Sequence, residues 1–145
     1  MRVETGDNVL IAGFIVIGSG QKSVAVRALG PSLPIAGALG NPILELHDAS
    51  GAIVASNDDW QSSQQTALIA AGLAPGNDRD AALIATLNAG SYTAVVRGVS
   101  STAGVALVEV YDLDGDQAPA RLANISTRGK VETGDNVMIG GFILR

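Results

Sequence analysis

Short apolar segments, each bounded by turn-forming residues, recur along the whole chain. The first, at 9–17, follows the turn residues of 5–8, and the second, at 22–29, alternates between apolar and polar positions. Runs of this length that are rich in β-branched residues and lack a helix cap predict strands. The same criteria predict further strands at 44–47, 52–55, 82–87, 92–98, 105–113 and 121–128.

The pattern predicts one short helix among these strands. Ser62 or Ser63 can cap a helix within 62–71, and Gly72 and Pro75 mark its end. About eight or nine short strands at regular spacing are typical of a sandwich or jelly roll. We therefore expect an all-β fold, a β-sandwich or jelly roll with one short helix.

One apolar segment occurs twice. Residues 3–15 read VETGDNVLIAGFI and residues 131–143 read VETGDNVMIGGFI, so 11 of 13 positions are identical at an offset of 128 residues. A self-match at a fixed long distance is typical of a tandem repeat. The sequence therefore predicts a β-sandwich repeat unit at 1–128 and, at 129–145, the first strand of the next unit.

The second copy predicts a strand that its own module does not need. A sandwich has one place for each strand, and a surplus apolar strand tends to pair with another chain. We therefore expect a donor strand that pairs with an identical module. The residues expected to make this contact are Val9, Leu10, Ile11, Phe14 and Ile15 in the first copy and Val137, Met138, Ile139, Phe142, Ile143 and Leu144 in the second.

Composition narrows the class of protein. The chain has 145 residues, 47% of them hydrophobic and only 3% aromatic, so one core built from Val, Ile, Leu and Ala is expected. A net charge of −5 argues against nucleic acid as a partner, because such binding needs clustered Lys and Arg. The absence of cysteine excludes disulfides and thiolate sites. No apolar run is long enough to predict a membrane span, and we expect any signal or anchor to lie outside these residues.

Three stretches resemble a known family. LELHDASGAIVASNDDW from Leu44, ALIATLNAGSYTAVVRG from Ala82 and GVALVEVYD from Gly104 are similar in order and spacing to the bacterial pre-peptidase C-terminal domain, over about half of the chain. The resemblance implies a β-sandwich carried by secreted bacterial enzymes or surface proteins, some of which bind calcium or matrix polymers. The flanking VETGDNV and LANISTRG stretches look similar instead to repeats of very large secreted bacterial proteins. A secreted or cell-surface location follows from both.

One acidic stretch is a candidate calcium site. Asn57, Asp58 and Asp59 bring carboxylate and amide oxygens together, and Asp48, Asp78 or Asp80 can add more if the loops meet. Calcium prefers six to eight oxygen ligands, and the resemblance raises the weight of a metal here. The alternative is that these residues end the strand and cap the helix. Calcium is the one candidate cofactor, and the structural alternative is favoured over it.

A second acidic stretch begins like an EF-hand loop. Asp112, Asp114 and Asp116 have the right spacing, but a Gly stands at the fourth position and Ala123 stands where a bidentate Glu is required. An EF-hand is therefore excluded. A solvated turn is expected, with a loose calcium site as the weaker alternative.

Other polar and aromatic residues point to structure rather than catalysis. His47 is the only histidine and no G-x-S-x-G motif is present, so we find no pair of nucleophile and base and expect no enzyme. Arg97 and Glu109 lie on strands expected to pair, which predicts an ion pair between them. Trp60 is expected to plug the edge of the sandwich, with a sugar-stacking role as the alternative.

Two functions remain. The first is an extracellular structural repeat that joins identical modules head to tail by strand addition or exchange, since contacts of this kind do not close and give filaments. The alternative is an accessory module that binds polysaccharide or another matrix polymer for a secreted enzyme or adhesin.

Overall fold

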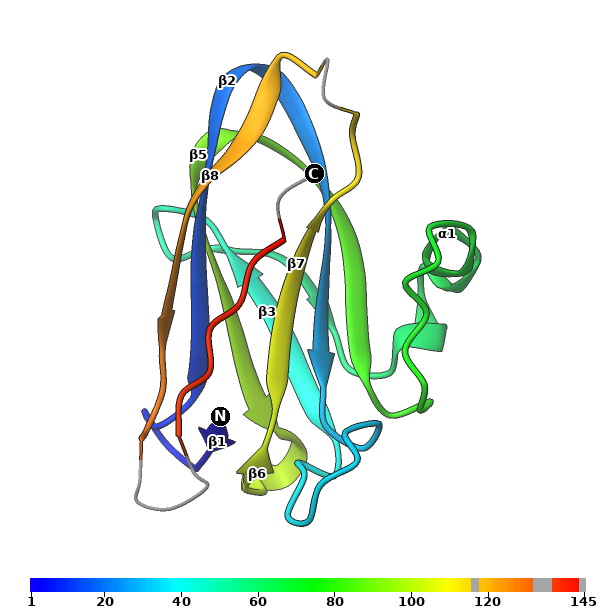
Figure 1. Cartoon of the computed structure of the whole chain (residues 1–145), viewed down its shortest axis with the longest axis vertical. Helices are drawn as coiled ribbons and strands as arrows, with labels where there is room; N and C mark the ends of the chain where they lie inside the picture. The colour runs from blue at the N-terminus through cyan, green and yellow to red at the C-terminus, as the bar shows by residue number, and fades with distance from the viewer. Residues whose placement is uncertain (116–117, 132–136, 144–145) are drawn as a thin grey trace.

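The computed structural model describes residues 1–115, 118–131 and 137–143, and it confirms an all-β sandwich (Figure 1). One helix of fewer than seven residues accompanies the strands. The elements are β1 (Arg2–Val3), β2 (Leu10–Leu29), β3 (Pro42–His47), β4 (Ile53–Asn57), η1 (Trp60–Ser62), α1 (Gln65–Ala70), β5 (Ala81–Gly98), η2 (Val99–Ser101), β6 (Gly104–Val105), β7 (Leu107–Asp112) and β8 (Ala120–Arg128).

Two long bent strands connect the layers. β2 and β5 pair antiparallel along most of their length, from Leu10 opposite Val96 to Ala28 opposite Ala81. The separate strands predicted at 9–17 and 22–29 are thus one strand, β2, and those predicted at 82–87 and 92–98 are likewise one strand, β5. β2 continues through the predicted turn because Gly18, with a φ of 103°, bends the strand without ending it.

Each half of the two long strands belongs to a different layer. The first half of β2 pairs with the second half of β5 and with β8, and β3 and β4 continue that layer beyond β5. The second half of β2 pairs with the first half of β5 and with β7. β1 and β6 form a separate two-stranded sheet. In Figure 1 the two layers face each other with the bends of β2 and β5 at one end.

Aliphatic side chains fill the space between the layers, as the composition predicts. Phe14, the one aromatic residue of this core that is fully buried, stacks on Tyr92 with ring centroids 5.7 Å apart. The most deeply buried aliphatic members include Val16, Val24, Val26, Leu39, Leu44, Leu46 and Val96.

The helix differs from the prediction in how it begins. Gln64 is the N-cap residue, and its side chain makes no cap hydrogen bond. Ser62 and Ser63 do not cap the helix; their hydroxyl groups accept hydrogen bonds from Asn57 Nδ2 at 3.3 and 3.4 Å. The side chain of Gln64 bonds instead to both backbone groups of Ile84. Bonding to the sheet therefore takes precedence over local capping.

The ion pair predicted between Arg97 and Glu109 is wrong. Glu109 lies opposite Arg27, because β7 pairs with β2 rather than with β5, and their side chains are 2.6 Å apart. Arg97 forms an ion pair with Glu45 on the neighbouring β3 instead. Both are cross-strand pairs of the kind expected, with different partners.

Candidate functional site

The first copy of the duplicated segment is built into the sandwich. Its apolar part forms the first half of β2 and lies between β5 and β8. Leu10 and Phe14 face the core and are each 2% exposed. Val9, Ile11 and Ile15 are half-buried. The first copy is therefore an integral, partly buried strand of its own module.

The second copy has the same residue types but no such environment. Residues 137–143 form neither helix nor strand in the structure. Ile139, Phe142 and Ile143 are 83%, 78% and 82% exposed, and Met138, the equivalent of Leu10, is 38% exposed. Leu144 lies outside the described residues. One module thus buries one copy and exposes the other.

The two copies begin side by side. Lys130 forms an antiparallel bridge with Arg2, its own equivalent in the first copy, and its ammonium lies 2.9 Å from Oε2 of Glu4. In the view of Figure 1, residues 137–143 rise in the same direction as the first half of β2 and cross between the ribbons of β8 and β7. The second copy therefore starts at the end of the sandwich where the first copy enters it.

Asn57 and Asp78, two of the candidate calcium residues, make structural hydrogen bonds with their side chains. Asn57 is buried, its Oδ1 accepts a hydrogen bond from the Ala82 N–H at 2.9 Å, and its Nδ2 donates to the Asp59 carbonyl. Asp78 accepts a bond from Gln61. Partial desolvation, followed by the charge of Asp59, raises the pKa of the Asp58 carboxyl.

Within the described parts of the chain, no three His, Cys, Asp or Glu side chains are grouped so that they could hold a metal ion. The calcium site stays a prediction that rests on the sequence. The structure supplies another role for the buried member of the set, since Asn57 joins the end of β4 to the start of β5 through its amide group.

In the second acidic stretch, Asp112 and Asp114 form ion pairs with the side chain of Lys22. The ammonium of Lys22, 2% exposed, lies 2.6 Å from Asp112 Oδ1 and 3.4 Å from Asp114 Oδ2. A hydrogen bond from the Ser23 N–H, followed by the charge of Lys22, lowers the pKa of Asp114. Asp116 lies outside the described residues. Sequence reasoning missed this ion pair, although Lys22 shares the alternating face of Val24 and points inward.

Trp60 acts as the plug that the sequence predicts. It is 5% exposed and packs with Leu68 and Ala82 in a small second cluster beneath the helix. Its ring is therefore not available on the surface as a platform for a sugar. Among the five aromatic residues of the chain, Phe142 is the one that the structure leaves largely exposed.

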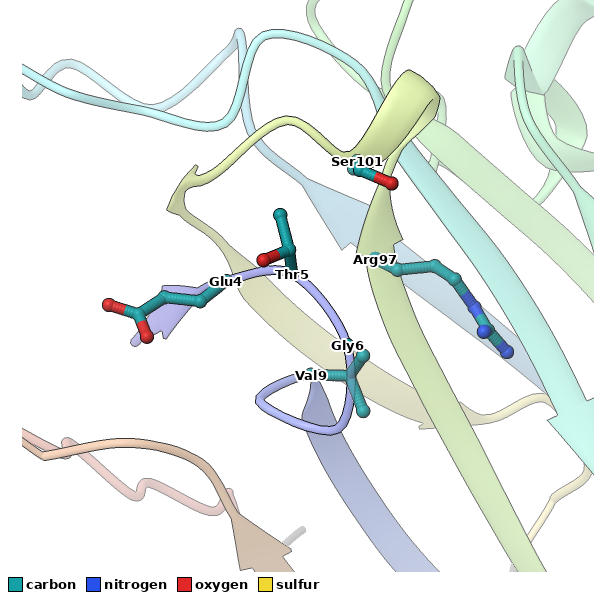
Figure 2. Close-up of a pocket in the computed structure, with 7 residues that line it drawn as sticks. Glu4, Thr5, Gly6, Val9, Arg97 and Ser101 are labelled. Carbon is teal, nitrogen blue, oxygen red and sulfur yellow. The ribbon is translucent and has the colours of Figure 1, made fainter.

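A pocket of about 260 Å³ lies where the turn of the first copy meets the end of β5, and Figure 2 shows the side chains around it. Glu4 and Arg97 point away from its centre in opposite directions, toward their partners Lys130 and Glu45. Thr5 and Ser101 contribute hydroxyl groups to the lining of the pocket. His47 is engaged elsewhere, with Glu45 and the Gly51 carbonyl, so the pocket contains no nucleophile with an adjacent base.

Comparison with known proteins yields no match to a family model, a curated protein or a solved structure. The resemblance to the pre-peptidase C-terminal domain and to secreted bacterial repeats therefore stays a prediction from the motifs quoted above. None of the helices in the described residues has the length and hydropathy needed to span a bilayer.

Proposed function

We propose that this chain is a structural repeat module of a secreted or cell-surface bacterial array, and that it joins identical modules head to tail through residues 137–143. The observation that carries the proposal is the contrast between the two copies. Phe14 is 2% exposed in the first copy, whereas its equivalent Phe142 is 78% exposed in the second. A sequence suited to a buried strand and left in solvent favours pairing with another molecule.

The expected strength of association follows from the exposed side chains. Burial of one large apolar side chain is worth roughly 1.5–3 kcal/mol, so Ile139, Phe142 and Ile143 together offer roughly 5–9 kcal/mol. Association costs an estimated 4–15 kcal/mol in lost freedom. Isolated modules should therefore associate weakly and at high protein concentration. A covalent tandem array would strengthen each contact through its high effective concentration.

The proposal is tested with the double variant Ile139→Asp/Phe142→Asp. We expect the unchanged chain to form oligomers of increasing size with concentration in light scattering after size exclusion, and filaments in electron micrographs. The double variant should stay monomeric, and at concentrations where the unchanged chain is also monomeric the two should have the same melting temperature, because both side chains lie outside the core.

The matched control is Ile69→Asp on α1, where an isoleucine is 56% exposed. It removes a comparable apolar surface elsewhere and should leave association intact. If the unchanged chain is monomeric at millimolar concentration, self-association is not its function. Retention of the monomeric chain on polysaccharide resin would then favour the accessory-module alternative, although Trp60 lies buried.

A further inference from the structure

The core of the sandwich is open on one side. Residues directly opposite one another in an antiparallel pair point to the same face of the sheet. Ile125 of β8 lies opposite Phe14 of β2 and therefore faces the core. Phe14 is 2% exposed, yet Ile125 is 62% exposed. Among the described residues, therefore, no side chain or strand covers Ile125 beside β8.

Other core-facing side chains of β8 and β7 are also incompletely buried. Thr127 lies opposite Ala12 and Leu122 opposite Val16, so both face the core. Thr127 is exposed and Leu122 half-buried, although their partners on β2 are at most 6% exposed.

In the other layer, β7 has two core-facing valines that are likewise only partly covered. Val108 and Val110 lie opposite Ala28 and Val26, which are fully buried, yet both valines are half-buried. We call this surface the open side; it consists of Val108, Val110, Leu122, Ile125 and Thr127.

The other edges of the sandwich offer an added strand fewer contacts. Along the first half of β5, side chains occupy the free backbone groups: Gln64 bonds to both backbone groups of Ile84, and Asn57 accepts from the Ala82 N–H. On β4, the exposed Ile53 lies opposite His47 on the outer face, whereas the core-facing Asn57 is 6% exposed. An added strand therefore gains core contacts on the open side and not elsewhere.

β8 also retains free backbone groups for pairing. In the described residues its only strand partner is β2. Arg121 and Arg128 are exposed on β8 and oppose the approach of a second β8, since like charges across an edge repel. Residues 137–143 carry no charge, so this repulsion does not act on them.

We propose that residues 137–143 of a second copy of this chain cover the open side by adding to the free edge of β8. The inference rests on the proposed function and names the surface that receives the donor strand. The occupant comes from another molecule because the segment's own module leaves Ile139 and Phe142 about four-fifths exposed. The contact adds a strand beside β8 and buries Ile125 together with the donor side chains.

The inference is tested with Ile125→Lys, which places a charge on the open side. We expect at least a tenfold rise in the dissociation constant for self-association. The melting temperature of the monomer should not change, because Ile125 is exposed there. The matched control is Val54→Lys on β4, where a valine is 46% exposed on another free edge; association of this variant should equal that of the unchanged chain.

Cysteine cross-linking gives an independent measurement, because the chain contains no cysteine. Tagged Ile125→Cys chains mixed with untagged Phe142→Cys chains should form a mixed disulfide dimer on oxidation, in greater yield than either variant forms with itself. Oxidation of the single chain that carries both cysteines would reveal a contact within one molecule as a cross-linked monomer, and that result would overturn the inference.

The two proposals fail in different ways. If Ile125→Lys associates normally while Ile139→Asp/Phe142→Asp does not, the donor strand binds another surface and only this inference is wrong. If the unchanged chain does not associate at all, both proposals are wrong.

Discussion

At the scale of single residues, buried polar side chains fix the loops to the sheets. Asp80 is fully buried, and its Oδ1 accepts a hydrogen bond from the Gly30 N–H at 2.8 Å. Asn57 bonds to Ala82, and Lys22 forms ion pairs with Asp112 and Asp114. Asn57 and Lys22 thus replace lost hydration with specific partners, as burial requires, whereas Oδ2 of the buried Asp80 has no hydrogen-bond partner among the described residues. Polar residues that resemble ligand sites in the sequence therefore stabilise chain reversals here.

The Asp114 carboxylate should make folding sensitive to acid. Its pKa in the folded state is lowered from the ordinary aspartate value near 3.8, so folding favours the ionised form. The stabilisation is therefore present above about pH 4 and is lost as pH falls through the lower folded-state pKa. We expect Asp114→Asn to lower the free energy of unfolding at pH 7 by about 1 kcal/mol. The difference from the unchanged chain should shrink below pH 4 in urea titrations followed by circular dichroism.

Asp7→Asn is the control for Asp114→Asn, since it removes the same charge from an exposed turn. It should leave the free energy of unfolding close to that of the unchanged chain. Equal behaviour of the two variants across this pH range would show that the contacts of Asp114 with Ser23 and Lys22 contribute nothing to stability.

At the scale of elements, the alternation of apolar and polar residues predicted where strands lie. It did not predict which neighbouring segments join into one longer strand. The turn residues around Gly18 and Gly90 suggested separate hairpin strands, because glycine in such a cluster usually ends a strand. In the structure β2 and β5 bend together and keep their pairing on both sides of the bend. Continuity depends on the partner strand, and a single sequence does not specify that partner. The same limit explains why the ion pair predicted for Arg97 forms with Glu45 rather than with Glu109.

The bend of β2 gives a prediction for Gly18. A Cβ atom at this position would lie 2.2 Å from the Pro119 carbonyl oxygen, and φ is 103°. Gly18→Ala should therefore destabilise the module by at least about 2 kcal/mol, since backbone strain and a backbone clash add. The control is Gly51→Ala, where φ is 84° with nothing within 4 Å; it measures the cost of strain without a clash, about 1 kcal/mol. Equal losses in chemical denaturation would show that the clash is relieved.

The duplicated segment shows how far local sequence determines an element. Residues 10–15 form a strand between β5 and β8, while the nearly identical residues 138–143 form none. The difference lies in their neighbours, because β propensity depends on cross-strand packing. The repeat and its apolar residues were predictable from the sequence. The open side was not predictable from the sequence, because it depends on which core-facing side chains of β7 and β8 stay exposed after folding.

At the scale of the whole molecule, the position of the first copy should accept the second. Met138 replaces Leu10 at similar volume and Phe142 replaces Phe14. Gly141 stands where Gly13 packs against β8; a Cβ atom on Gly13 would lie 2.7 Å from Ser126 Oγ. Each chain therefore carries two segments that fit one position. In the unchanged chain the first copy holds it, with Leu10 and Phe14 both 2% exposed.

Weakening the first copy should reveal this competition. Loss of a buried Phe side chain typically costs 3–5 kcal/mol, but Phe14→Ala should lose less because the second copy of another chain supplies Phe142. Its melting temperature should rise with protein concentration, as mass action requires for a partner bound only in the folded state. The double variant Phe14→Ala/Phe142→Ala should show the full loss at every concentration, and Phe142→Ala should melt like the unchanged chain at concentrations where the unchanged chain is monomeric. Identical melting of Phe14→Ala and the double variant would show that the second copy cannot replace the first, whereas a difference that is independent of concentration would place the replacement within one chain.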